Sequence, residues 1–176
     1  MGNSIILQRN GAYIGSLKMN NSLTSIFVDV LVLSGSHLAS TEYERDLVVF
    51  IASADQNVYG IGTVGFDLRE MPWSPEHFEP QRSFLLKSVE AAMARTGWDR
   101  LSYQPNEDWL FESLQSFEGL IRLMSVHDVD PSAREKWLAD NSRSDQLCHK
   151  HNALTHSGGC VICNDETGGP LYGSPG

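Results

Sequence analysis

The first half of the chain carries hydrophobic patterns typical of β-strands. Two short runs rich in Ile, Leu and Tyr, residues 4–9 and 12–17, flank Asn10-Gly11, a dipeptide that favours the tight turn of a β-hairpin. Three further runs are apolar at nearly every position, as expected for central strands covered on both faces. They are residues 25–33, 46–53 and 57–66. The links between the runs are short, so the pattern predicts an antiparallel sheet of about five strands.

The second half of the chain carries helical spacing instead. Apolar side chains recur at steps of three and four residues over 84–93, and Gly97 follows as a helix-terminating glycine. A second amphipathic stripe covers residues 110–124. A third, shorter helix is expected with Asp130 as its N-cap and Pro131 in its first turn. Strands followed by helices predict an α+β fold, in which helices pack on a face of the sheet.

All three cysteines lie in one window near the C-terminal end, CHKHNALTHSGGCVICND, which also holds three of the six histidines. Two residues separate Cys148 from His151, and two residues separate Cys160 from Cys163. Two such pairs joined by a short loop supply the four tetrahedral nitrogen and sulfur ligands that zinc prefers. The window therefore predicts a zinc site made by these four side chains.

This spacing resembles the short Cys3His segments of zinc knuckles and zinc-ribbon-like modules, over only a small part of the chain. A disulfide is disfavoured, because it would leave one cysteine unpaired. A catalytic zinc, as in the zinc deaminases, calls for H-x-E and P-C-x-x-C, whereas here no Glu stands beside the first pair and no Pro precedes Cys160. We therefore expect a closed structural site. The fourth ligand stays open, because His149 or His156 could replace His151.

Length and composition fit one globular protein with a small appendage. The 176 residues are 41% hydrophobic and 20% charged. We expect an α+β domain over residues 1–140, a zinc-binding segment over 141–167 and a flexible tail over 168–176. No apolar run approaches the ~20 residues that a membrane helix needs. No secretory signal is recognised at the N-terminus, so a cytoplasmic location without membrane contact is the expectation.

The charge is unevenly placed. The net charge is −9, and most of the excess negative charge lies between Glu42 and Glu79. This balance disfavours nucleic acid, whose phosphates require lysine and arginine. It would suit a basic protein partner, with Glu42, Glu44, Glu76 and Glu79 as the candidate contact residues. Acidity that serves only solubility is the alternative.

No other motif names a reaction. The run GIGTVG over residues 60–65 matches G-x-G-x-x-G, but no helix pattern follows it, and we interpret its glycines as a flat face of a strand. The favoured hypothesis is a non-enzymatic binding protein with a structural zinc, which in size and acidity resembles bacterial immunity and antitoxin proteins that mask basic toxins. The alternative is a hydrolase-type enzyme whose site uses scattered residues such as His127 and Asp128, or the metal.

Overall fold

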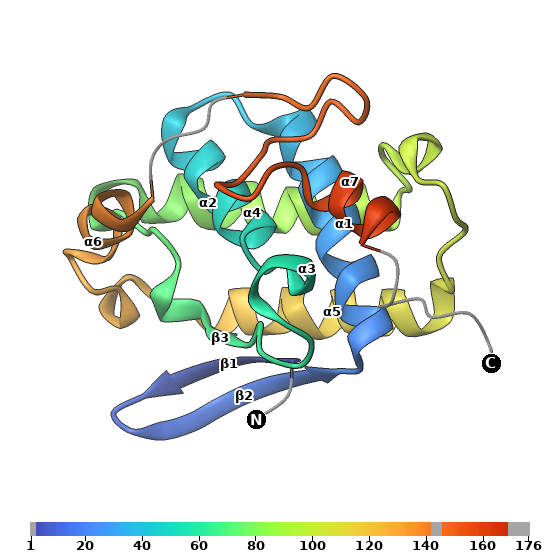
Figure 1. Cartoon of the computed structure of the whole chain (residues 1–176). Helices are drawn as coiled ribbons and strands as arrows, with labels where there is room; N and C mark the ends of the chain where they lie inside the picture. Colours follow the sequence, from blue (N-terminus) through green and yellow to red (C-terminus); the bar gives the residue numbers. More distant parts are fainter. Residues whose placement is uncertain (1–2, 142–145, 169–176) are drawn as a thin grey trace.

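The sheet has three strands, in the order β2-β1-β3 (Figure 1). The structure is a computed structural model that describes residues 3–141 and 146–168. Strand β1 (Asn3–Arg9) pairs antiparallel with β2 (Ala12–Met19) and parallel with β3 (Phe66–Asp67). Seven α-helices accompany this sheet in the described part of the chain. The protein is therefore α+β in general, but the prediction of about five antiparallel strands is wrong.

The predicted hairpin is present between β1 and β2. Asn10 and Gly11 both adopt positive φ, 52° and 77°, as a two-residue hairpin turn of this kind requires. Further along the two strands, Ile5 of β1 pairs with Leu17 of β2, and both side chains are buried. This face of the hairpin packs against helix α5 (Glu107–Leu123). Buried positions alternate along most of β1, because only one of its faces is covered.

Two predicted strands are helices. Helix α1 (Asn21–Leu38) contains residues 25–33, and helix α2 (Glu42–Ala52) contains residues 46–52, with residue 53 as its C-cap. Within α1 every residue from 27 to 35 is buried, because neighbouring elements cover the helix on all sides. A helix without a solvent face has no polar stripe, so its continuous apolar run is indistinguishable from that of a buried strand.

The third predicted strand, residues 57–66, is a turn. It begins within the short helix α3 (Gln56–Tyr59) and ends at the first residue of β3. Gly60 and Gly62 have φ values of 103° and 77°, a backbone conformation that other residues rarely adopt. These glycines therefore reverse the chain, and they do not form a flat strand face.

The helices of the second half agree with their spacing. Helix α4 (Phe78–Met93) and α5 cover the two predicted stripes, and α6 (Ala133–Asp140) is the third. Two details differ. The left-handed residue that follows α4 is Arg95, with φ 62°, before Gly97 is reached. Helix α6 begins later than expected, because the Asp130 carboxylate accepts hydrogen bonds from the backbone and hydroxyl of Ser132.

Helix α1 is the centre of the molecule. It packs against α2, α4, α5 and the C-terminal helix α7 (Val161–Thr167), which lies over α1 away from the hairpin (Figure 1). At Gly35 a Cβ atom would lie 2.7 Å from Val48 Cγ2, so the glycine lets α1 and α2 approach closely. Four 3-10 turns complete the described elements. They are η1 (Leu68–Glu70), η2 (Pro75–His77), η3 (Trp98–Arg100) and η4 (Val126–Asp128).

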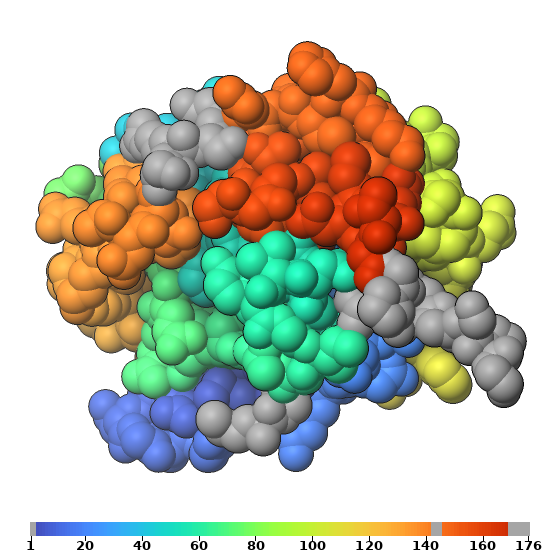
Figure 2. All heavy atoms as spheres, viewed as in Figure 1, coloured from blue at the N-terminus to red at the C-terminus, as the bar shows by residue number. Residues whose placement is uncertain are grey.

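The segment 146–168 contributes side chains to the same hydrophobic core as α1. Ala153, Leu154, Val161 and Ile162 are all buried in it. On the surface this segment lies beside α3, as Figure 2 shows. The predicted division near residue 140 stays a prediction, and the predicted tail lies, except for its first residue, outside the described residues. Within the described ranges, no helix has both the length and the apolar character that crossing a membrane requires.

Candidate metal centre

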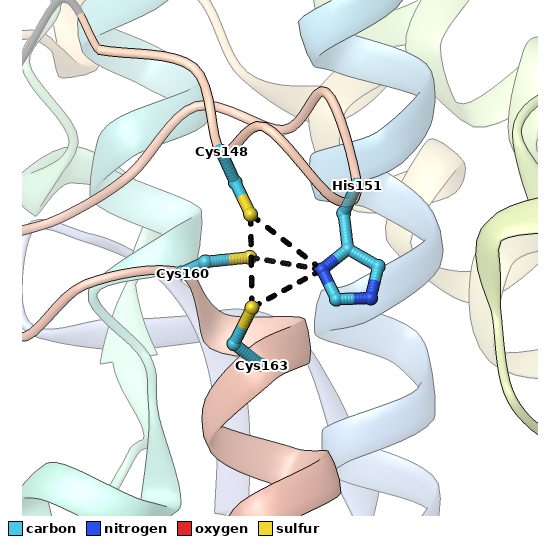
Figure 3. Close-up of side chains that lie close together, drawn as sticks. All are labelled: Cys148, His151, Cys160 and Cys163. Atoms are coloured by element: carbon cyan, nitrogen blue, oxygen red, sulfur yellow. Dashed lines mark hydrogen bonds between the residues drawn. The ribbon is translucent and has the colours of Figure 1, made fainter.

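Three cysteines and one histidine converge at the C-terminal segment. The Sγ atoms of Cys148, Cys160 and Cys163 and one ring nitrogen of His151 all lie within 4.8 Å of one another (Figure 3). His151 Nδ1 is 3.7, 3.6 and 3.3 Å from these three sulfurs in chain order, and Cys148 Sγ is 3.6 Å from Cys163 Sγ. The three thiols form no disulfide. These four side chains could hold a metal ion.

A small hairpin positions the first pair of ligands. Leu147 and Leu154 form an antiparallel bridge, and the chain between them curls so that Cys148 N donates to Ala153 O at 2.8 Å. Asn152 closes this loop with a φ of 51°, and its N–H donates to the carbonyl of Cys148 at 2.7 Å. The C-x2-H spacing thus places both side chains on the inside of one tight turn.

A second turn and helix α7 position the other pair. The backbones of His156 and Gly159 exchange two hydrogen bonds, and Gly159 has a φ of 102°. At Gly158 a Cβ atom would lie 2.8 Å from the His156 ring, so the turn accepts only glycine there without movement. Cys160 then follows as the N-cap of α7, and Cys163 lies in the first helical turn. The Ser-Gly-Gly sequence therefore aims the second pair of sulfurs at the first.

The hydrogen bonds of the histidines identify His151 as the fourth side chain. His151 Nε2 lies 3.0 Å from Glu166 Oε1, which fixes Nε2 as the protonated nitrogen and leaves the Nδ1 lone pair facing the sulfurs. His156 accepts a hydrogen bond from Gly158 N at Nδ1 and donates from Nε2 to Asp55. His149 is exposed and lies outside the cluster. The structure therefore brings His151, and neither His149 nor His156, to the three cysteines.

Glu166 is a site residue that the sequence interpretation missed. It accepts hydrogen bonds from His151 and from the Lys150 ammonium group. Although burial opposes the shift, these two partners hold the pKa of Glu166 below its usual range. The signal was present, because Glu166 follows Cys163 by three residues and so shares its face of α7.

The environment separates the acidities of the thiols. Burial alone would raise the pKa of Cys148, but hydrogen bonds from the backbones of His151 and Lys150 and from the His151 ring lower it to about 6. Burial raises the pKa of Cys160 to about 12. A bound cation would favour the thiolate form of both, because metal binding displaces thiol protons.

A buried polar network ties the metal segment to the body of the protein. His156 Nε2 donates to Asp55 Oδ2 at 2.9 Å, and both side chains are fully buried. The side-chain amide of Asn164, on α7, donates to the same Asp55 oxygen at 2.8 Å. Leu154 N donates to Ser36 Oγ on α1 at 2.8 Å. The segment thus has anchors on α1 and α3 that do not involve the metal.

Two buried carboxyl groups meet under α7. Tyr103 donates to Oδ2 of Asp29 on α1, and Asn57 donates to Oδ1 of Asp165 on α7, while the other oxygen of each carboxyl group is buried without a donor. Burial and then the neighbouring Asp165 raise the pKa of Asp29 well above its usual value. We infer one proton on Asp29, shared with Asp165, because two ionised carboxylates buried beside each other repel. This pair joins the first helix to the last.

Of the two residues proposed for a hydrolase site, Asp128 is held in an ion pair with Arg9. The Arg9 guanidinium holds Asp128 through two hydrogen bonds of 2.8 Å, and Asp128 also caps η4 by accepting from Ser125 N. The hydrogen bond from Arg9 is the main cause of an Asp128 pKa of about 2. His127 beside it is exposed. The ion pair between Arg9 and Asp128 joins the hairpin to the end of α5.

The four glutamates of the charge pattern lie at the starts of two neighbouring helices. The rings of Tyr43 and His77 stack at a centroid separation of 3.8 Å, so the first turn of α2 lies beside η2 and the start of α4. Carboxylates at helix N-termini are favoured by the helix dipole. The acidic surface so formed carries Glu42, Glu44, Glu76 and Glu79.

Some of these carboxylates are engaged within the chain. Glu44 accepts hydrogen bonds from the backbone of Thr41 in a capping box, which gives it a structural role in α2. Glu42 pairs with Arg134 at 3.5 Å. Glu79 Oε2 lies 3.6 Å from Nε of Arg82. Glu42 and Glu79 are nevertheless exposed, so their pairs are screened by water.

Comparisons with known protein families, with curated proteins and with solved structures find no match to this chain. The fold and site therefore define its class by themselves. The chain is an α+β protein with a Cys3His cluster that could bind a metal ion.

Proposed function

We propose that the Cys3His cluster is a structural zinc site that joins the turn after Leu147 to helix α7 within the segment 146–168. The main support for this proposal is the geometry of the four donor atoms. Zn–S bonds of about 2.3 Å and a Zn–N bond of about 2.05 Å at tetrahedral angles give edges of roughly 3.8 Å between sulfurs and 3.6 Å between sulfur and nitrogen. The sulfur–sulfur contact of 3.6 Å and the sulfur–nitrogen contacts of 3.3 to 3.7 Å are close to these edges, and all four donor atoms lie within 4.8 Å of one another.

A structural role is supported by the closure of the cluster. Four protein donors complete a tetrahedron and leave no position for a water or a substrate. His151 is 1% exposed and Cys160 is 6% exposed, so these two side chains face the core. The carboxylate of Glu166 is engaged by His151 and Lys150. Three thiolates, softer than oxygen ligands, favour zinc over magnesium or calcium.

Metal analysis tests this proposal directly. The protein purified without chelator should carry about one zinc ion per chain. His151→Gln should lose the zinc, because it removes the only nitrogen ligand, whereas the matched variant His149→Gln should keep it. Wild-type protein that lacks zinc and has three freely reactive thiols would refute the proposal.

Hydrogen exchange tests what the metal does. Chelation should increase exchange in residues 146–168 and in the part of α1 beneath them, while the β1–β2 hairpin and α5 keep their protection. The reason is that the hairpin and α5 pack on each other without the segment. Global loss of protection would show instead that the zinc holds the whole core together.

We further propose that the protein acts by binding a basic protein partner, in the manner of an immunity or antitoxin protein in the cytoplasm. The support is the net charge of −9 and the gathering of the acidic surface around the Tyr43–His77 stack. Opposite charges accelerate association, and the effect weakens with salt. A hydrolase-type activity, built on scattered residues or on the metal, is the competing function.

Charge reversal on the acidic surface tests the proposed binding of a basic partner. Glu44 must be kept, because its carboxylate caps α2. Reversing Glu42, Glu76 and Glu79 to lysine should slow association with a cross-linked and identified partner by at least ~10-fold at low salt. The control reverses three exposed acids on η3 and α5, with the same change in net charge. They are Asp99, Asp108 and Glu112.

The two variants separate the outcomes. Equal association rates would show that the acidic surface serves solubility only. Turnover by the zinc-loaded wild type on a panel of ester, phosphoester and peptide substrates would favour the enzyme instead.

A further inference from the structure

Two of the three sulfurs in the metal centre form a close and accessible pair. Cys148 Sγ lies 3.6 Å from Cys163 Sγ, and both side chains are partly exposed. Cys160 is buried, with 6% of its surface exposed. Cys148 lies in the turn of the small hairpin, and Cys163 lies in the first turn of α7. A dissolved oxidant therefore meets this pair before it meets Cys160.

We propose that Cys148 and Cys163 are an oxidation site, at which a hydroperoxide forms a disulfide and releases the metal. This regulation of the centre rests on the proposed zinc function for its metal-release step, but disulfide formation does not. A sulfur–sulfur bond is about 2.05 Å long, so the two atoms must approach by only a small movement of the hairpin turn.

The reaction balances with hydrogen peroxide as the oxidant. One of the two thiolates attacks a peroxide oxygen, the O–O bond breaks, and a sulfenic acid and hydroxide form. The second thiolate attacks the sulfenyl sulfur, the S–O bond breaks, and a second hydroxide leaves. The two sulfurs together lose two electrons, and the peroxide gains them. The ion then keeps only His151 and Cys160 from the chain, too few ligands for a tetrahedral site, and it dissociates as Zn²⁺.

The disulfide replaces the metal as the connection between the hairpin and α7. Cys148 is bonded to α7 in either state, first through the ion and then through Cys163. The anchors to the body of the protein, His156 on Asp55 and Leu154 N on Ser36, use neither sulfur. The oxidised segment therefore stays on α1, and a thiol reductant restores the site. This distinguishes the pair from a Cys160–Cys163 disulfide, which would lie within α7 and would not hold Cys148.

The test uses the zinc-loaded full-length chain and hydrogen peroxide. Zinc release is followed with a chromophoric chelator, and disulfides are mapped by peptide mass spectrometry after the free thiols are alkylated. We expect one released zinc per Cys148–Cys163 disulfide, free Cys160, and recovery of zinc binding after reduction. Cys160→Ser should still form the disulfide, whereas Cys148→Ser and Cys163→Ser should not.

Several outcomes would overturn the oxidation site. They are a dominant disulfide that contains Cys160, irreversible sulfinic acids without a disulfide, or retention of zinc and thiols at peroxide concentrations that oxidise free cysteine. Mapping on the wild-type chain is decisive even if a variant fails to fold. If the purified chain holds no zinc but still forms the Cys148–Cys163 disulfide, the zinc proposal fails and the oxidation site stands.

Discussion

Glu166 should tune the affinity of the centre for zinc without touching the ion. Its carboxylate lies 3.0 Å from His151 Nε2 and is 16% exposed, so the hydrogen bond is largely shielded from water. A carboxylate that accepts from the far nitrogen of a ligating imidazole fixes the ring and raises the basicity of the nitrogen that binds the metal. Glu166→Gln keeps an oxygen acceptor and removes the charge. Glu166→Ala removes both.

The expected magnitudes follow from that difference. Loss of such a partner costs ~10- to 100-fold in metal affinity, equivalent to about 1.4 to 2.7 kcal/mol. Because the glutamine amide still accepts from Nε2–H, Glu166→Gln should lie near the lower end of this range. Glu166→Ala should lie near the upper end. In both variants the Lys150 ammonium also loses its partner and leaves a positive charge beside the centre.

Zinc affinity can be measured by competition with a chromophoric chelator at fixed pH and ionic strength. Glu112→Gln is the matched control, because Glu112 is exposed on α5 and loses the same charge. Dissociation constants of both Glu166 variants within twofold of the control, in proteins with unchanged circular dichroism, would refute the role of Glu166. They would also weaken the assignment of Nδ1 as the donor atom of His151.

Three further changes probe the surroundings of the centre. Asp29→Asn should raise the melting temperature at pH 7 and change it little near pH 4. Because the pKa of Asp29 is raised in the folded protein, folding at neutral pH must take up a proton, and this cost disappears as the pH falls. Equal melting temperatures of variant and wild type at pH 7 would contradict the proton shared with Asp165. Asp128→Asn should lower the free energy of unfolding by about 1 to 2 kcal/mol at pH 7. This value follows from the lowered pKa of Asp128 and is reduced because Arg9 is 41% exposed, so water screens the pair. Since the pKa of Asp128 is lowered to about 2, the wild-type protein should be more stable than the variant above pH ~4, and this difference should fade between pH ~4 and ~2 in urea titrations. A stability difference that does not depend on pH would exclude the ion pair as its source. Gly158→Ala should lower zinc affinity in the chelator competition by displacing the turn before the second cysteine pair, whereas Gly119→Ala, with open space around its Cβ, should not.

Local signals in the sequence identified those elements whose faces differ in exposure. Asn10-Gly11 predicted the hairpin, and the stripe over 110–124 predicted α5, because each of these elements has one buried face and one wet face. The run over 25–33 misled for the opposite reason. Helix α1 is covered on every side, so no periodicity of 3.6 remains in its hydrophobicity, and the continuous apolar run was interpreted as a central strand.

The metal ligands were predictable, but their surroundings were not. The spacing of Cys148, His151 and the later cysteine pair reflects two tight turns, which are local structures encoded by neighbouring residues. The contact between Asp55 and His156 joins positions 101 residues apart, and no short-range pattern announces it. The same holds for Asp29 under α7. Such contacts arise only when the helices have packed.

The burial of α1 under the end of the chain has a consequence for protein synthesis. The ribosome releases α1 before the segment 146–168, so the side of α1 that carries Asp29 stays open to water until that segment has been synthesised. During that interval the apolar surface is available to chaperones and to other nascent chains. A chain terminated before Ala153 never covers it, so such products keep an exposed apolar surface that promotes aggregation.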